Sequence, residues 1–216
     1  MSITTFSKKG MFHEQNNTEN QDAVFSYEDD NICYIALADG ATSCKNSKTG
    51  AEIACKCIKD FLINSDIFNF SANKLAYLVW EEIMFHIKNE ASILNDTEKS
   101  FASTFAFTYL DKKSNRLVTY NLGDGAIYIL HNTSSEYELL SPPKRTDGVC
   151  MLIPNKNAYK SAEINIIENF NGEIFMCSDG LLDLMKKNDV SIEKIKENHD
   201  IYTGMDDFSF ILLCNY

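Results

Sequence analysis

The sequence has few of the residues that break a chain into separate units. Only three of its 216 residues are proline, and neither a low-complexity tract nor an internal repeat occurs. No stretch approaches the ~20 consecutive apolar residues that cross a membrane as a helix. The first residues, MSITTFSKKGMFHEQ, lack the apolar core of a signal peptide. We therefore expect one domain over residues 1–216, located in the cytoplasm.

Positive charge is also scarce. The chain has 20 Lys and Arg residues against 31 Asp and Glu residues, which gives a formal net charge of −11. Phosphate contacts dominate the affinity of proteins for nucleic acids, so general nucleic-acid binding is disfavoured. Anionic membrane surfaces would repel the chain for the same reason. We expect neither as a partner.

The sequence lacks closely spaced cysteine pairs of the CxxC type. The seven cysteines are odd in number and show no CxxC spacing. Cys33, Cys177 and Cys214 lie in apolar runs, where a reduced cysteine behaves as a small hydrophobic residue. This pattern argues against a disulfide framework and against a zinc site, and it favours a reducing compartment.

The apolar pattern predicts grouped strands and grouped helices. Two longer helices are expected at 50–63 and 73–94, the second with Ser71 as N-cap, and shorter ones at 180–186 and 191–198. Grouping without strict alternation indicates an α+β fold of antiparallel sheets packed by helices. The polar, turn-rich segment at about 141–160 predicts a long surface loop. The expected strands are 23–27, 32–38, 104–110, 117–121, 126–130, 162–167, 174–177 and 208–214.

Aspartates mark the ends of several expected strands. Asp39, Asp124 and Asp179 each end an apolar run and are followed by glycine, whereas Asp22 and the pair 206–207 precede one. Carboxylates gathered at strand ends repel one another unless a cation neutralises them, and oxygen ligands suit Mg²⁺ and Mn²⁺. Any single Asp-Gly can equally be ordinary turn chemistry. The set as a whole favours a metal cleft.

The order of these motifs resembles that of the metal-dependent protein phosphatases (PPM, or type 2C), in particular a compact bacterial branch. The similarity extends from about residue 10 to residue 215 and rests on six short motifs in the family's order. These are Asp22, Asp39-Gly40, Ser103-Thr104, Gly123-Asp124-Gly125, Ser178-Asp179-Gly180-Leu181 and Asp206-Asp207.

The resemblance implies a four-layer αββα sandwich, two antiparallel sheets flanked by helices, with a dinuclear Mn²⁺ or Mg²⁺ centre at one edge. Asp39 would bridge both metals and Gly40 would lend a backbone carbonyl. Asp179 and Asp206 would complete the ligands of the first metal, and Asp22 would orient metal-bound water. The acids that bind a weaker third metal in some members correspond to Asp124 and Asp183. Asp207 falls where the family often has Asn, so the ligand role is assigned to Asp206.

Metal-ion chemistry then suggests the reaction. Two cations about 3.5–4 Å apart supply hydroxide near neutral pH, which attacks phosphorus in line without a covalent intermediate. The expected substrate is a protein phosphorylated on serine or threonine, such as a target of a cognate Ser/Thr kinase. Two alternatives stay open at this point. One is a pseudophosphatase that serves as a regulatory binding module, and the other is a hydrolase of small phosphoesters.

Three features depart from the wider family, and one of them is the loop ATSCKNS (41–47), which replaces a glycine pair and a His of the wider family. Many members have a phosphate-binding Arg where this chain has Asn17, and many eukaryotic members have a His where it has Ala41. His13 is the candidate to compensate, because an imidazole can bind phosphate or protonate a leaving group; the alternative is a structural or solvated histidine. Lys45 and Lys48 could attract phosphate or simply be solvated. Lys144 and Arg145 lie where family members place a substrate-recognition flap.

Overall fold

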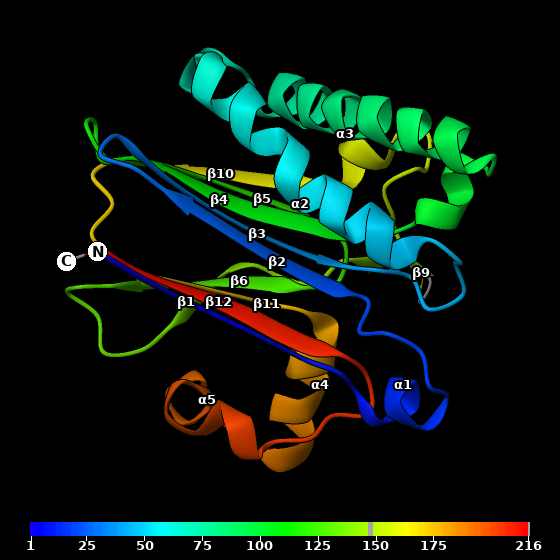
Figure 1. The fold of residues 1–216 in the computed structure, drawn as a ribbon. Coiled ribbons are helices and arrows are strands. Elements are labelled where there is room, and N and C mark those ends of the chain that lie inside the picture. Colours follow the sequence, from blue (N-terminus) through cyan, green and yellow to red (C-terminus); the bar gives the residue numbers. More distant parts are fainter. Residues whose placement is uncertain (147–148, 216) are drawn as a thin grey trace.

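The computed structural model describes residues 1–146 and 149–215. Within them the chain forms two five-stranded antiparallel sheets that pack face to face, with helices on both outer faces (Figure 1). One sheet has the order β1-β12-β11-β6-β7, the other β10-β5-β4-β3-β2. Helices α2 and α3 cover the second sheet, while α4 and α5 cover the first. No helix of the described part is long and apolar enough to pass through a membrane.

The strands are β1 (Ser2–Lys8), β2 (Asp22–Glu28), β3 (Ile32–Asp39), β4 (Phe105–Asp111), β5 (Arg116–Leu122), β6 (Ala126–His131), β7 (Glu138–Ser141), β8 (Arg145–Thr146), β9 (Val149–Cys150), β10 (Glu163–Ile167), β11 (Gly172–Cys177) and β12 (Phe208–Asn215). The α-helices are α1 (Met11–Gln15), α2 (Ser47–Asn64), α3 (Ala72–Leu94), α4 (Asp179–Asn188) and α5 (Ile192–Asn198). Short 3₁₀ helices lie at Ile67–Asn69, Glu98–Phe101, Ala158–Ser161 and His199–Ile201.

Strand β3 shows why the sandwich has three apolar layers. Alternate side chains of a strand point to opposite faces of its sheet. Cys33, Ile35 and Leu37 pack between the two sheets, whereas Tyr34 and Ala36 pack against the helical pair. A strand buried on both faces carries a continuous apolar run, which is why this segment is so hydrophobic.

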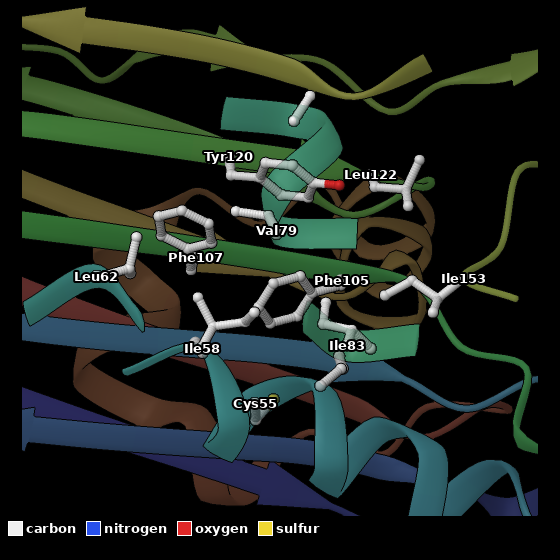
Figure 2. Packing of buried hydrophobic residues seen from close by; sticks show 14 of the residues in the cluster. Cys55, Ile58, Leu62, Val79, Ile83, Phe105, Phe107, Tyr120, Leu122 and Ile153 are labelled. Carbon is white, nitrogen blue, oxygen red and sulfur yellow. The ribbon is translucent and has the colours of Figure 1, made fainter. Parts of the chain in front are cut away.

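The helical pair rests on aromatic residues of the second sheet (Figure 2). Ile58 of α2 and Val79 of α3 lie over Phe105, Phe107 and their neighbours, all fully buried. The spacing of three and four residues places one apolar stripe of each helix against the sheet. Ser71 caps α3 as predicted, accepting a hydrogen bond from the backbone N of Lys74.

The predicted strands and helices are all confirmed, and the α+β sandwich with them. Strands β1 and β7 were not predicted, because β1 (SITTFSK) consists mostly of polar residues and β7 (ELLS) has only four residues. The expected loop at 141–160 is not wholly irregular. It contains the hairpin β8–β9 and a 3₁₀ turn, while residues 147 and 148 lie outside the described part of the chain.

Candidate metal centre

Aspartates from five separate segments meet at one end of the sandwich. Antiparallel pairing aligns the start of β2 with the end of β3, so Asp22 lies opposite Asp39. Likewise the end of β11 meets the start of β12, which brings Asp179 toward Asp206, and Asp124 follows β5. A pocket of about 190 Å³ opens between four of these acids, whereas Asp22 lines a different pocket. The lining of the first pocket comprises Asp39, Gly40, Ala41, Thr42, Thr104, Asp124, Cys150, Leu152, Asp179 and Asp206.

Local hydrogen bonds fix the position of Asp39. Its backbone N donates to Oγ1 of Thr104 at 2.9 Å, and the backbone N of Thr104 donates to its carbonyl at 2.8 Å. Gly40 continues this contact as a bridge to Ser103. A Cβ on Gly40 would lie 2.9 Å from the backbone of Ser47, so only glycine fits between the strand end and helix α2. The Ser103-Thr104 motif therefore supports the acid and need not bind a ligand itself.

Three carboxylates of this end, those of Asp22, Asp39 and Asp179, have raised pKa values. Burial raises the pKa of Asp22 to about 7, and the Asp207 charge adds to the effect. Burial also raises the pKa of Asp39, with further increases from Asp22 and Asp179. The pKa of Asp179 rises through burial and the charge of Asp124. The pocket therefore favours positive charge, whether protons or cations.

The donor atoms suit a hard divalent cation. Buried carboxylate oxygens Oδ1 of Asp22 and Oδ1 of Asp179 have no hydrogen-bond partner among the described residues. Oxygen ligands of this kind are those that Mg²⁺ and Mn²⁺ prefer. No three His, Cys, Asp or Glu side chains of the described residues converge closely enough to form a ready-made metal site. The residues fit a cation in their chemistry, and binding would draw them together.

Asp206 and Asp207 have different surroundings. Three donors converge on Asp207: the backbone N of Gly10 at 2.7 Å, the backbone N of Gln21 at 2.5 Å and Nδ1 of His13 at 2.7 Å. Both of its oxygens are engaged, whereas Asp206 lines the pocket and, among the described residues, accepts only from the backbone N of Asp207, at 2.9 Å. An Asn at position 207 would have one acceptor oxygen for three donors.

Several residues singled out in the sequence lie apart from the pocket. His13 is buried in α1 against Asp207. Asn17 is exposed in the turn after α1, with a left-handed φ of 52°. Lys48 donates to the backbone carbonyl of Asp22 at 2.6 Å, and Lys45 is exposed. Asp183 is exposed on α4 and lines a different pocket with Asp206, so Asp124 and Asp183 do not share one.

Arg145 enters the site from the β8–β9 hairpin, which sequence patterns placed only in a surface loop. Its Nε donates to Oδ2 of Asp124 and its Nη2 to Oδ2 of Asp179, each at 2.8 Å.

Ser178 was part of a motif without an assigned role. Its Oγ donates to Oδ2 of Asp22 at 3.0 Å and accepts from the backbone N of Ser209 at 3.0 Å. Hydroxyl residues next to an Asp-Gly turn give little signal in a sequence.

Comparison with known proteins identifies relatives of the whole arrangement. The family model described as "Protein phosphatase 2C" matches residues 9–204. Among solved structures, serine/threonine phosphatase Stp1 from Staphylococcus aureus shares 16% identity at a TM-score of 0.69, covering 100% of this chain and 95% of Stp1. The Mycobacterium tuberculosis serine/threonine phosphatase PstP shares 15% identity at a TM-score of 0.65, covering 100% of this chain and 99% of that one.

A third solved structure is RsbX in complex with magnesium. It shares 16% identity at a TM-score of 0.62, covering 97% of this chain and 92% of RsbX. At these identities the likeness concerns the fold. No curated protein sequence matches the chain.

Proposed function

The chain belongs to the protein phosphatase 2C family, and we propose that it dephosphorylates phosphoserine and phosphothreonine in proteins with the aid of two Mn²⁺ or Mg²⁺ ions. The observation that carries this proposal is the gathering of carboxylates from five segments at one end of the sandwich, where four of the acids line one pocket. Burial and mutual repulsion raise the pKa values of Asp22, Asp39 and Asp179 there. Clustered acids of this kind are costly unless a cation neutralises them. The magnesium complex of RsbX supports the choice of ion.

The structure suggests a division of roles among the residues. Asp39 would bridge the two ions, and the carbonyl of Gly40 would join the ligands of one. Asp179 and Asp206 would complete the coordination of the first ion, since Asp206 is free of the hydrogen bonds that occupy Asp207. The third and weaker ion that the resemblance implies at Asp124 and Asp183 would require these two acids to approach each other, because they line different pockets.

Asp22 is suited to orient a water molecule. Ser178 donates to its Oδ2, which leaves the buried Oδ1 available. The bound cations would lower the pKa of water and offset negative charge on the phosphoryl oxygens. Phosphoryl transfer requires little more than such positioning and electrostatic stabilisation.

A covalent cysteine intermediate is not expected. Cys150 is the thiol that lines the pocket. Burial, followed by the charge of Asp124, raises the pKa of Cys150 well above its ordinary value. The nucleophilic thiolate is thus disfavoured at this position. Direct attack by water activated in the pocket needs no residue in that role.

One observation favours a second candidate, a regulatory binding module without catalysis. Arg145 occupies Asp124 and Asp179, and the described residues contain no ready-made cluster of three metal ligands. The enzyme is favoured because every acid that the resemblance assigns to the metal centre is present in the chain. A direct assay separates the two functions.

The first test is hydrolysis of p-nitrophenyl phosphate with Mn²⁺, with Mg²⁺ and with EDTA, for the wild type, Asp179→Ala and Asp60→Ala. Asp60 is an exposed acid of α2, so its variant controls for the loss of one negative charge. Metal-dependent turnover that only Asp179→Ala abolishes would support the phosphatase. Folded wild-type protein without turnover under any metal would favour the binding module. Comparing a phosphopeptide panel with free phosphoesters would then separate protein from small-molecule substrates.

A further inference from the structure

Arg145 joins two acids of the pocket through its guanidinium group. Nε donates to Oδ2 of Asp124 and Nη2 to Oδ2 of Asp179, both at 2.8 Å. Half of the Arg145 side chain is exposed (52%), whereas the Asp124 side chain is almost buried (9%). A guanidinium stays charged at all physiological pH values, so Arg145 is a permanent cation here. It is the internal counter-ion of the pocket.

The segment that carries Arg145 is fixed at its base and separate from the main sheets. In the part of the chain that the structure describes, strand β8 pairs only with β9, with Arg145 opposite Cys150. Before it, the backbone N of Lys144 donates to the carbonyl of Gly123, and after it the backbone N of Ile153 donates to Ser103, each at 2.9 Å. The base of the hairpin thus stays at the rim of the pocket, while the side chain can change partners without unpairing a sheet.

We propose that Arg145 and a divalent cation compete for Asp124 and Asp179, and that the displaced guanidinium binds the phosphoryl group of the substrate. The proposal rests on the proposed function of the same pocket. A cation bound to these two carboxylates would neutralise them and repel the guanidinium. The planar fork of donors that fits carboxylates fits phosphate oxygens equally well.

Other cations of the chain are poorly placed for this role. Lys144 lies next in sequence, but its Nζ pairs with Glu163 at 2.8 Å. Lys48 is held on the carbonyl of Asp22, and Asn17 carries no charge. Within residues 1–146 and 149–215, Arg145 is the cation whose ion pairs go to the pocket acids. It would supply the positive charge that Asn17 does not.

Metal binding tests the competition directly. Mn²⁺ binding would be measured by isothermal titration calorimetry for the wild type, Arg145→Ala, Arg145→Lys and the control Lys144→Ala, which removes one positive charge from the same segment. Losing a charged hydrogen-bonded competitor should tighten Mn²⁺ binding roughly tenfold in Arg145→Ala. Lys144→Ala should match the wild type. Unchanged or weaker Mn²⁺ binding in Arg145→Ala would overturn the competition.

Phosphate binding tests the second part of the proposal, the contact between Arg145 and the phosphoryl group. Here Arg145→Ala should weaken binding, whereas it should tighten the binding of Mn²⁺. At saturating Mn²⁺, the affinity for inorganic phosphate should fall roughly tenfold or more in Arg145→Ala and less in Arg145→Lys, which keeps the charge but loses the fork. If Arg145 had a merely structural role, Arg145→Ala would bind both Mn²⁺ and phosphate more weakly. Phosphate affinity equal to that of the wild type would overturn the phosphate role.

Neither titration depends on turnover. A wild type that binds Mn²⁺ without hydrolysing phosphoesters would therefore contradict the proposed function, while the two affinities would still decide the role of Arg145. Circular dichroism of each variant checks that the fold is intact, as expected for a half-exposed side chain.

Discussion

Nδ1 of His13 lies 2.7 Å from Oδ2 of Asp207, and both side chains are almost completely buried. The pair links helix α1 to the start of β12, 194 residues away in the sequence. Asp207 also accepts from the backbone of Gly10 and of Gln21, so one carboxylate ties together the segments that flank the pocket. The neighbouring Asp206 is left to face the pocket itself.

Replacing His13 should chiefly destabilise the fold. His13→Ala leaves the buried Asp207 without one of its partners, which should lower the free energy of unfolding by about 2–4 kcal/mol. Urea denaturation would measure the change. His86→Ala is the control, because His86 is half-exposed on α3 and pairs with Glu82; it should change stability by less than about 0.5 kcal/mol. A His13→Ala protein of normal stability with reduced turnover would instead support a catalytic His13.

Asp22 should make stability depend on pH when the metal is removed. Burial raises its pKa to about 7 in the folded chain, against an ordinary value of 3.8, so between these pH values the folded state binds a proton that the unfolded state lacks. Stability should thus fall as pH rises from about 4 to about 7, by up to about 4 kcal/mol.

Urea denaturation in EDTA at pH 5 and pH 8 would measure this effect. Asp22→Asn should lose part of the pH dependence, and added Mn²⁺ should restore stability at pH 8 in the wild type. An identical pH dependence in Asp22→Asn would contradict the prediction.

Gly180 should tolerate no side chain. A Cβ there would lie 2.0 Å from the carbonyl oxygen of Asp207, which would push α4 away from the start of β12. Gly180→Ala should therefore lower the free energy of unfolding by about 2 kcal/mol or more and weaken Mn²⁺ binding. Lys187→Ala, an exposed change on the same helix, is the control. Denaturation and calorimetry would measure both effects, and wild-type values for Gly180→Ala would contradict the prediction.

The acids Asp124 and Asp183 should differ in their effect on metal binding. Asp124 is buried and lines the pocket with Asp39 and Asp179, whereas Asp183 is exposed and lines another pocket. Asp124→Ala should thus alter Mn²⁺ affinity more than Asp183→Ala. Isothermal titration calorimetry with Mn²⁺ would compare the two variants. If both variants lost the same weak site, Asp124 and Asp183 would share a third ion, and the prediction would be wrong.

The sequence was sufficient for most of the architecture. In β3, the apolar run is continuous because both faces of the strand are buried. In α3, the spacing of apolar residues and the cap at Ser71 predict its start to within one or two residues. The edge strands β1 and β7 could not be predicted in this way, because β1 consists mostly of polar residues and β7 has only four residues.

Local patterns were enough to show which acids stand at strand ends, because a buried apolar run that stops at Asp39 or just before Asp179 places that carboxylate where the strand leaves the core. What each acid contacts depends on the packing of segments that are far apart in the chain. Asp206 and Asp207 are adjacent in the chain, yet three donors from distant segments occupy one and leave the other to the pocket. Arg145 reaches Asp124 and Asp179 from a hairpin with no periodic pattern. Contacts between residues far apart in sequence depend on how the sheets and loops pack, and local patterns do not carry that information.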